Sequence, residues 1–191
     1  MKKYLLPSIR LTGVLLVLLC ILYPLFIAAV AKLAPGGGDG VTVSYRGKVV
    51  GYENIGQGFK NDKYFQPRPS AVGYNAAGSG ASNKGPTNPD YLKSVQAAID
   101  TFMVHNPGIN KADIPAELVT ASGSGLDPDL SPEGAKIQVK RVAALRHIPE
   151  QDLMRLVEEH TEKPLLGIFG PAKVNVLKLN IALDEMKPLS K

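Results

Sequence analysis

LTGVLLVLLCILYPLFIAAVA, residues 11–31, decides the architecture of this chain because it carries no charged residue. The run has 21 residues and lies between Arg10 and Lys32. A helix rises about 1.5 Å per residue, so this run would span roughly 31 Å, close to the hydrocarbon thickness of a bilayer, about 30 Å. The sequence therefore predicts one transmembrane helix at residues 11–31, preceded by a short N-terminus at residues 1–10.

A cleaved signal peptide is the alternative interpretation of this run. Lys2, Lys3 and Arg10 could form its basic start, and residues 29–31 (Ala-Val-Ala) fit a small-x-small cleavage site. The apolar part of a signal peptide is usually about 7–15 residues long, however, and this run is longer. We therefore favour a retained membrane anchor.

The charges on either side of the run predict its orientation. Lys2, Lys3 and Arg10 precede it, whereas only Lys32 follows closely. Because Lys and Arg are enriched at the cytoplasmic ends of membrane helices, we expect the N-terminus in the cytoplasm and the rest of the chain outside.

The net charge of +5 comes mainly from the residues that flank the membrane run. Four of the 22 basic residues lie at or before residue 32, so the rest of the chain carries 18 basic and 17 acidic residues. This balance gives no sign of a nucleic-acid partner. The lone Cys20 lies inside the membrane run, so an exported domain would be held together by its core, without a disulfide.

Residues 41–191 predict a single α+β domain outside the membrane, joined to the anchor by a Gly-rich hinge at residues 32–40. Alternating apolar residues around Arg46-Gly47 indicate a two-stranded hairpin. The segment at residues 172–184 (AKVNVLKLNIALD) indicates a strand that passes into a short helix. We expect the strands to form a small, mainly antiparallel sheet.

Three helices are expected in this domain. Asn88 and Ser131 are good N-caps followed by proline, and Pro149 opens the third helix. The first helix is expected to bury one apolar face at helical spacing. This face consists of Leu92, Val95, Ile99, Phe102 and Met103.

Residues 64–91 (YFQPRPSAVGYNAAGSGASNKGPTNPDY) are rich in Gly, Ser, Asn and Pro, yet they lie between segments with folding signals. Prolines on both sides of Arg68 restrict the backbone and present the guanidinium from a stiff loop. We interpret the segment as a partner-facing loop. A second interpretation, that Arg68 ties the loop to its own domain, stays open. The partner-facing candidates are Tyr64, Phe65, Arg68, Ser70, Ser82 and Asn83.

Catalytic chemistry has weak support in the sequence. Ser82 with Lys84 could form the Ser–Lys dyad of a membrane-anchored hydrolase at the cell exterior, which is the alternative function that we keep. A lysine acts as the base of such a dyad only when it is desolvated, and Lys84 stands in a polar stretch. We therefore predict no catalytic residue.

Metal and anion sites are also weakly supported. His105, His147 and His160 are far apart and lack metal-binding spacing, so no metal is predicted. The turn Ser122, Gly123, Ser124, Gly125 could form an anion nest, although glycine and serine in a tight turn explain it more simply.

Taken together, three motifs and the single membrane run resemble one known family. The motifs are RPSA at residues 68–71, ELVTASGSGLDP at residues 117–128 and VNVLKLN at residues 174–180. The chain resembles the small C subunit of the Kdp-type potassium-transporting ATPases, and the resemblance covers almost the whole chain.

The resemblance implies an accessory subunit in an ATP-driven, high-affinity potassium importer of a bacterial or archaeal plasma membrane. The partners would be a channel-like subunit that binds potassium and a P-type ATPase subunit that forms the phospho-enzyme, with membrane lipid around the anchor. In that family the C subunit has been proposed to raise the ATP affinity of the catalytic subunit. ATP is thus the only cofactor implied, and we expect none to be firmly bound to this chain.

The predicted orientation conflicts with direct ATP binding, because only about ten residues would face the cytoplasm. We therefore expect the domain to cap the outer mouth of the potassium-binding subunit and to affect ATP affinity indirectly. The anchor would pack on that subunit through small residues that permit close approach. These are Gly13, Ala28, Ala29 and Ala31.

Overall fold

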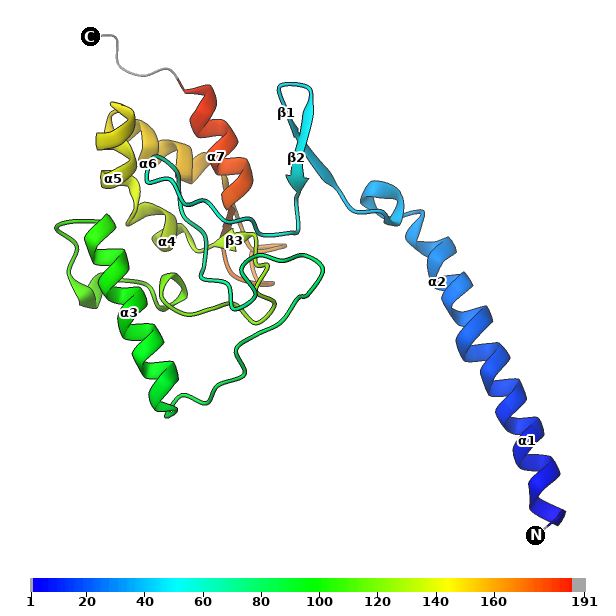
Figure 1. The fold of residues 1–191 in the computed structure, drawn as a ribbon. Helices are drawn as coiled ribbons and strands as arrows, with labels where there is room; N and C mark the ends of the chain where they lie inside the picture. The colour runs from blue at the N-terminus through cyan, green and yellow to red at the C-terminus, as the bar shows by residue number, and fades with distance from the viewer. Residues whose placement is uncertain (1, 187–191) are drawn as a thin grey trace. The chain divides into compact units, whose positions relative to one another are not determined.

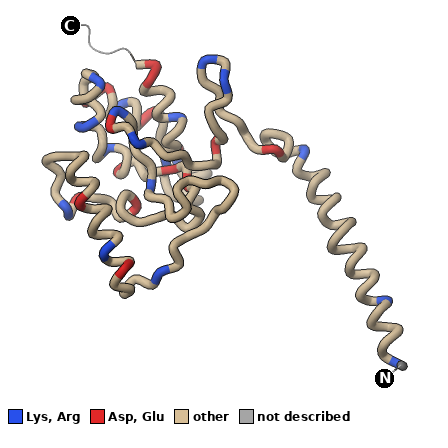
Figure 2. The backbone as a smooth tube through the Cα atoms, in the orientation of Figure 1, with Lys and Arg blue, Asp and Glu red and all other residues tan. Residues whose placement is uncertain are grey.

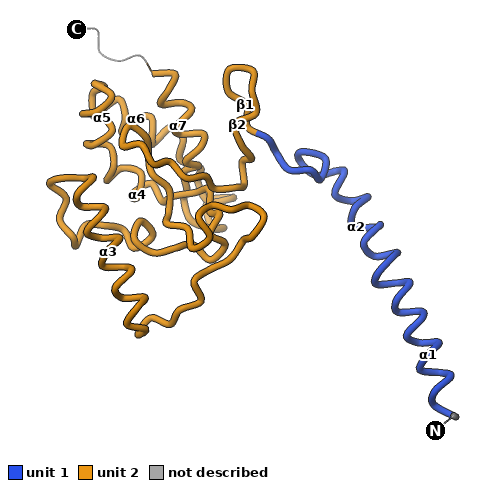
Figure 3. Tube along the Cα trace, in the orientation of Figure 1, with its two compact units in different colours: residues 1–42 blue, residues 43–191 orange. Residues whose placement is uncertain are grey.

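The fold is taken from a computed structural model that describes residues 2–186. The chain divides into two compact units, residues 1–42 and residues 43–191 (Figure 3). Of the predicted exported domain, residues 187–191 lie outside the described part.

The first unit contains the predicted apolar helix, which is confirmed. It consists of α1 (Lys2–Leu16), a π-helical turn (Val17–Leu22) and α2 (Tyr23–Ala31). Residues 3–31 have a mean hydropathy of 2.9 over their most apolar stretch, and none of that stretch is buried. Its middle carries no charge, with Arg10 near one end and Lys32 at the other (Figure 2). By length and composition the helix can cross a membrane.

The π-helical turn ends at Leu22, two residues before Pro24. The Tyr23 N–H donates to the carbonyl of Leu18, five residues back. Proline has no N–H, and its ring collides with the carbonyl four residues earlier in a regular helix. The wider turn therefore accommodates Pro24 without ending the helix.

The segment predicted as a hinge contains a short turn, Pro35–Gly38. Gly36, Gly37 and Gly38 all have positive φ, at 77°, 62° and 87°. A side chain at Gly38 would come within 3.2 Å of the Ala31 Cβ. The glycines therefore let the chain fold back against the end of α2.

The predicted hairpin and small antiparallel sheet are confirmed. The hairpin pairs β1 (Thr42–Tyr45) with β2 (Lys48–Tyr52) through Arg46-Gly47, both with positive φ, which is the backbone of a tight hairpin turn. The sheet has the strand order β3-β5-β4 and is antiparallel throughout. Its strands are β3 (Asp129–Leu130), β5 (Lys173–Asn175) and β4 (Thr161–Glu162).

The helices of the domain begin where the capping residues predict. Asn88 accepts hydrogen bonds from the N–H groups of Asp90 and Tyr91 at the start of α3, and Ser131 accepts one from Gly134 at the start of α4. The α+β class is confirmed (Figure 1). The helices are α3 (Pro89–His105), α4 (Pro132–Lys136), α5 (Val139–Arg146), α6 (Glu150–Glu159) and α7 (Val176–Glu185).

Two helix predictions were wrong in part. The second predicted helix is broken into α4 and α5 at Gln138, whose side chain turns back to the carbonyl of Gly134. The apolar face predicted for α3 is only partly covered. Phe102 is buried and Val95 and Ile99 are half-buried, but Leu92 and Met103 are 53% and 37% exposed.

The core lies where α6 packs against α4, α5 and α7, with the sheet beside them. α6 buries Leu153, Leu156 and Val157, which recur at helical spacing. The fully buried side chains include Phe65, Val142, Leu153, Val157, Val174, Leu179 and Leu183. Phe65 belongs to the long segment between β2 and α3 (cyan to green in Figure 1), so this segment enters the core at one point.

Candidate functional site

The segment at residues 62–70 is held by side chains that bond its backbone N–H and C=O groups, as a neighbouring strand would in a sheet. The Phe65 N–H donates to the Asn180 Oδ1 at 2.9 Å, and the Asn180 Nδ2 donates to the Phe65 carbonyl at 2.9 Å. Asn180 lies on α7 and is only 2% exposed. One amide side chain thus satisfies both backbone groups of a buried residue.

Gln138 does the same for the next residue of the segment. Its Oε1 accepts from the Gln66 N–H at 2.8 Å, and its Nε2 donates to the Gln66 carbonyl at 3.0 Å. Gln138 is fully buried at the break between α4 and α5. The break in the predicted helix therefore places this amide against the segment.

Arg141 of α5 holds the start of the segment. Its guanidinium donates to the carbonyls of Asp62 and Tyr64, to the Asn106 Oδ1 at 2.9 Å and to the Gln138 Oε1 at 2.7 Å. Burial lowers the pKa of Arg141 below its ordinary value, and the Asp62 carboxylate partly opposes this effect. Because arginine stays protonated in proteins, these acceptors are what make its burial tolerable.

Tyr64 and Phe65, two predicted partner-facing residues, have different surroundings. The Tyr64 hydroxyl donates to Asp184 at 3.0 Å, and the Arg146 guanidinium stacks over the Tyr64 ring at 4.5 Å. Arg146 also pairs with Asp184 at 2.7 Å. Phe65 has no exposed surface, so its prediction as a partner-facing side chain was wrong and it serves the core.

Arg68 pairs with Asp127 at 2.9 Å, and both side chains remain about one quarter exposed, at 25% and 29%. The Tyr74 hydroxyl donates to the Arg68 carbonyl at 2.5 Å. Burial raises the pKa of Tyr74 to about 12, so the phenol keeps its proton. Arg68 therefore ties the segment to its own domain, and it leaves part of its guanidinium at the surface.

Ser70 and the turn at residues 122–125 bind each other. The Ser70 hydroxyl donates to the Gly125 carbonyl at 2.6 Å, and the Ser122 N–H donates to the Pro69 carbonyl at 3.2 Å. Gly125 has φ of 67°, and a side chain there would meet the Gly80 carbonyl at 2.8 Å. Close packing of two loops thus accounts for Ser122 and Gly125.

Ser82 and Asn83 lie farther along the loop and are exposed, as is Lys84. Ser82 and Lys84 line a cavity of about 380 Å³ between the loop and α3. An exposed lysine is solvated, and this does not favour a Ser–Lys dyad.

The histidines lie at helix ends. His105 ends α3 and its Nδ1 is 2.9 Å from Asp62, while His160 follows α6 and its Nδ1 is 2.9 Å from the Leu156 carbonyl. His147 follows α5 in the left-handed conformation. Within the described part of the chain, no group of three His, Cys, Asp or Glu residues could hold a metal ion.

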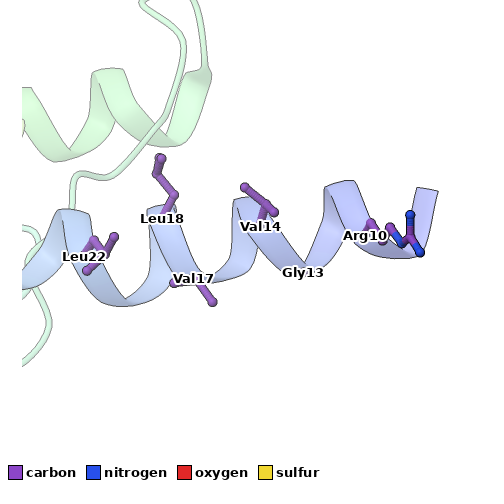
Figure 4. Close-up of a pocket in the computed structure, with 6 residues that line it drawn as sticks. All are labelled: Arg10, Gly13, Val14, Val17, Leu18 and Leu22. Atoms are coloured by element: carbon purple, nitrogen blue, oxygen red, sulfur yellow. The ribbon is translucent and has the colours of Figure 1, made fainter. Parts of the chain in front are cut away.

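The membrane helix carries a shallow groove of about 600 Å³ beside Gly13 (Figure 4). A side chain at Gly13 would meet no atom within 4 Å, so another helix could approach the backbone there. Ala28 and Ala29 lie outside this groove, and Ala31 packs against Gly38. The groove is lined by Arg10, Gly13, Val14, Val17, Leu18 and Leu22.

Sequence reasoning missed the three polar side chains that hold the segment. Gln138 and Arg141 stand among apolar residues in IQVKRVAAL (residues 137–145), and Asn180 stands among them in LKLNIAL (residues 177–183). A polar residue on an otherwise apolar helix face is the signal that could have revealed them. What each would bind could not be inferred, because the partners are 72 to 115 residues away.

The comparison with known proteins follows from this architecture. The family model described as "K+-transporting ATPase, c chain" matches residues 5–185, which include the apolar helix and nearly all of the domain. The chain belongs to the KdpC family. The resemblance inferred from the three motifs is thereby confirmed.

Relatives in the KdpC family match along almost their whole length. The potassium-transporting ATPase KdpC subunit of Flavobacterium psychrophilum is 54% identical over 185 residues, which cover 97% of this chain and all of that protein. The subunit of Bacteroides fragilis is 53% identical over 188 residues, with 97% and 98% covered. That of Bacillus cereus is 42% identical over 182 residues, with 94% of each covered.

Proposed function

We propose that this chain is the accessory, non-catalytic subunit of an ATP-driven potassium import complex and is needed for its assembly and activity. The observation that carries the proposal is the family match over residues 5–185. A single family model covers both the apolar helix and the domain. The side chains that looked most reactive in the sequence support a structural role. Arg68 and Ser70 bind groups of their own domain, and Lys84 is exposed.

The proposed topology places the N-terminus in the cytoplasm and the domain outside the plasma membrane. Lys3 and Arg10 precede the uncharged stretch, and the excess of positive charge at this end supports the orientation. The membrane helix contacts the channel-like potassium-binding subunit through the groove beside Gly13. The domain lies at the outer mouth of that subunit, and the P-type ATPase subunit is the third member of the complex.

ATP does not bind this chain directly in the proposed topology, because the domain and the nucleotide are on opposite sides of the membrane. Any effect on ATP affinity passes through the assembled complex. We expect the full chain to co-purify in mild detergent with both large subunits, and potassium-stimulated ATP hydrolysis to require it. The purified chain alone should give no saturable ATP binding in equilibrium dialysis. Saturable binding at micromolar ATP would contradict this topology.

The exposed quarter of the Arg68 side chain is also proposed to bond a group of a partner subunit, so replacing Arg68 by alanine is expected to lower potassium transport by the reconstituted complex by about tenfold. A hydrogen bond with a charged group contributes about 1.5–3 kcal/mol, and about 1.4 kcal/mol corresponds to a factor of ten. If the Arg68→Ala complex assembles fully and transports potassium normally, Arg68 has no partner role and serves only to pair with Asp127.

The substitution Ser82→Ala, in the same loop, distinguishes the two candidate functions. It leaves transport unchanged in an accessory subunit, and it abolishes activity in a Ser–Lys hydrolase.

A further inference from the structure

The turn between β4 and β5 exposes four large apolar side chains. It has the sequence PLLGIFGP, residues 164–171. Leu165, Leu166, Ile168 and Phe169 are 70%, 82%, 76% and 60% exposed, and we call these four residues the apolar tip. Exposed apolar patches are typical of surfaces that bind another protein or a membrane.

The backbone of the apolar tip is locked. Leu165 and Phe169 exchange two hydrogen bonds of 3.0 Å, and the Gly167 N–H donates to the Pro164 carbonyl at 2.9 Å. Leu166 has φ of 54°, which is uncommon for a large residue and is maintained only where the surroundings enforce it. The backbone that carries the four side chains is therefore fixed, which lowers the backbone entropy lost on binding.

The charges at the base of the tip identify the kind of surface that would cover it. Residues 164–172 carry no charge. At the base, Lys173 pairs with Asp129 at 2.8 Å and with Glu162 at 3.6 Å. The hydrogen bond to Asp129 raises the pKa of Lys173 above its ordinary value. The ammonium group therefore stays protonated and paired with the two carboxylates. Lys163, directly before the tip, is also exposed, and the four charged residues around the base (Asp129, Glu162, Lys163 and Lys173) sum to zero net charge. Elements that bind lipid surfaces usually carry an excess of Lys and Arg, and the tip with its base carries none.

We propose that the apolar tip inserts into an uncharged, apolar cleft on the outer surface of the channel-like potassium-binding subunit. This inference rests on the proposed function, which supplies that subunit as the neighbour of the domain. A preorganised set of apolar residues binds a cleft of fixed shape more tightly than a flexible set does. A fluid bilayer adapts to any arrangement, so preorganisation adds no affinity there. The neutralised base fits an uncharged rim around such a cleft.

Photocrosslinking in the assembled complex tests the proposal. Ile168 is replaced by p-benzoylphenylalanine, the complex is reconstituted in lipid nanodiscs, and the adduct is identified by mass spectrometry after illumination. An adduct with the channel-like subunit is expected. Val104 on α3 is 79% exposed, close to the 76% of Ile168, and the same probe there should give no such adduct. An adduct of position 168 with lipid or with the ATPase subunit, or no adduct, overturns the proposal.

A pair of matched substitutions gives a second measurement. Ile168→Asp should reduce the amount of chain retained with the complex during detergent washing by about tenfold, while Val104→Asp should not. Thermal unfolding of both variants by circular dichroism verifies that each domain is folded. Equal retention of the two variants overturns the role of the tip and leaves the proposed function intact. If the unaltered chain does not co-purify with the channel-like subunit, both proposals fall.

Discussion

Replacing Arg141 by methionine is expected to lower the free energy of unfolding of the domain by about 3–5 kcal/mol. Arg141 is 6% exposed, and its guanidinium holds the carbonyls of Asp62 and Tyr64. Methionine keeps much of the volume but leaves these buried acceptors without a donor. Because a domain is usually stable by only about 5–15 kcal/mol, this loss approaches complete unfolding. Urea unfolding of the full chain, followed by far-ultraviolet circular dichroism, measures it.

The matched control is Arg155→Met. Arg155 lies on the neighbouring helix α6, is 65% exposed and pairs with Asp152 at the surface. Exposed pairs contribute little, so its effect should stay within about 0.5 kcal/mol. A third variant, Arg141→Lys, should recover only part of the stability, because lysine lacks the fork that reaches several acceptors at once. If Arg141→Met and Arg155→Met unfold at the same urea concentration, the segment does not depend on Arg141.

Replacing Phe65 by alanine is the second change with a large expected effect, also about 3–5 kcal/mol. The Phe65 ring is completely buried in the core cluster. Alanine leaves a cavity there, and the bonds between Asn180 and the Phe65 backbone keep the segment from collapsing into it. The thermal midpoint of the full chain, measured by circular dichroism, should fall accordingly.

Phe169→Ala is the control for the loss of a phenyl ring. Phe169 is 60% exposed in the apolar tip, so its removal should hardly change the stability of the chain alone. Phe65→Leu should lie between the two, because leucine refills most of the space. A Phe65→Ala variant as stable as Phe169→Ala would show that residue 65 does not anchor the loop to the core.

Local signals in the sequence predicted most of the elements. The uncharged run predicted the apolar helix, Asn88 and Ser131 predicted the starts of α3 and α4, and the sequence at residues 172–184 predicted β5 followed by α7. Each of these signals acts within a few residues, through capping, periodicity or length. The family was predictable as well, because its motifs are long and continuous.

The placement of the long loop could not be predicted in the same way. The aromatic pair Tyr64-Phe65 suggested a surface for a partner, yet Phe65 is a core residue. Its segment is buried because Asn180 and Gln138 bond the backbone groups of residues 65 and 66. These contacts join residues that are far apart in sequence, and no local pattern encodes them. The exposure of the apolar tip was not predicted either, because a short apolar run looks the same in sequence whether it is buried or exposed.

The bonds between Phe65 and Asn180 join residues separated by 115 positions, and in the proposed topology this spacing affects when the domain can fold. With the N-terminus in the cytoplasm, as proposed, residues near Phe65 would leave the membrane first and α7 (Val176–Glu185) almost last. Until α7 arrives, the early segment lacks the amide that completes its backbone hydrogen bonds. In that topology the domain would close only when nearly the whole chain has crossed, and we expect a chain truncated before residue 176 to stay accessible to proteases.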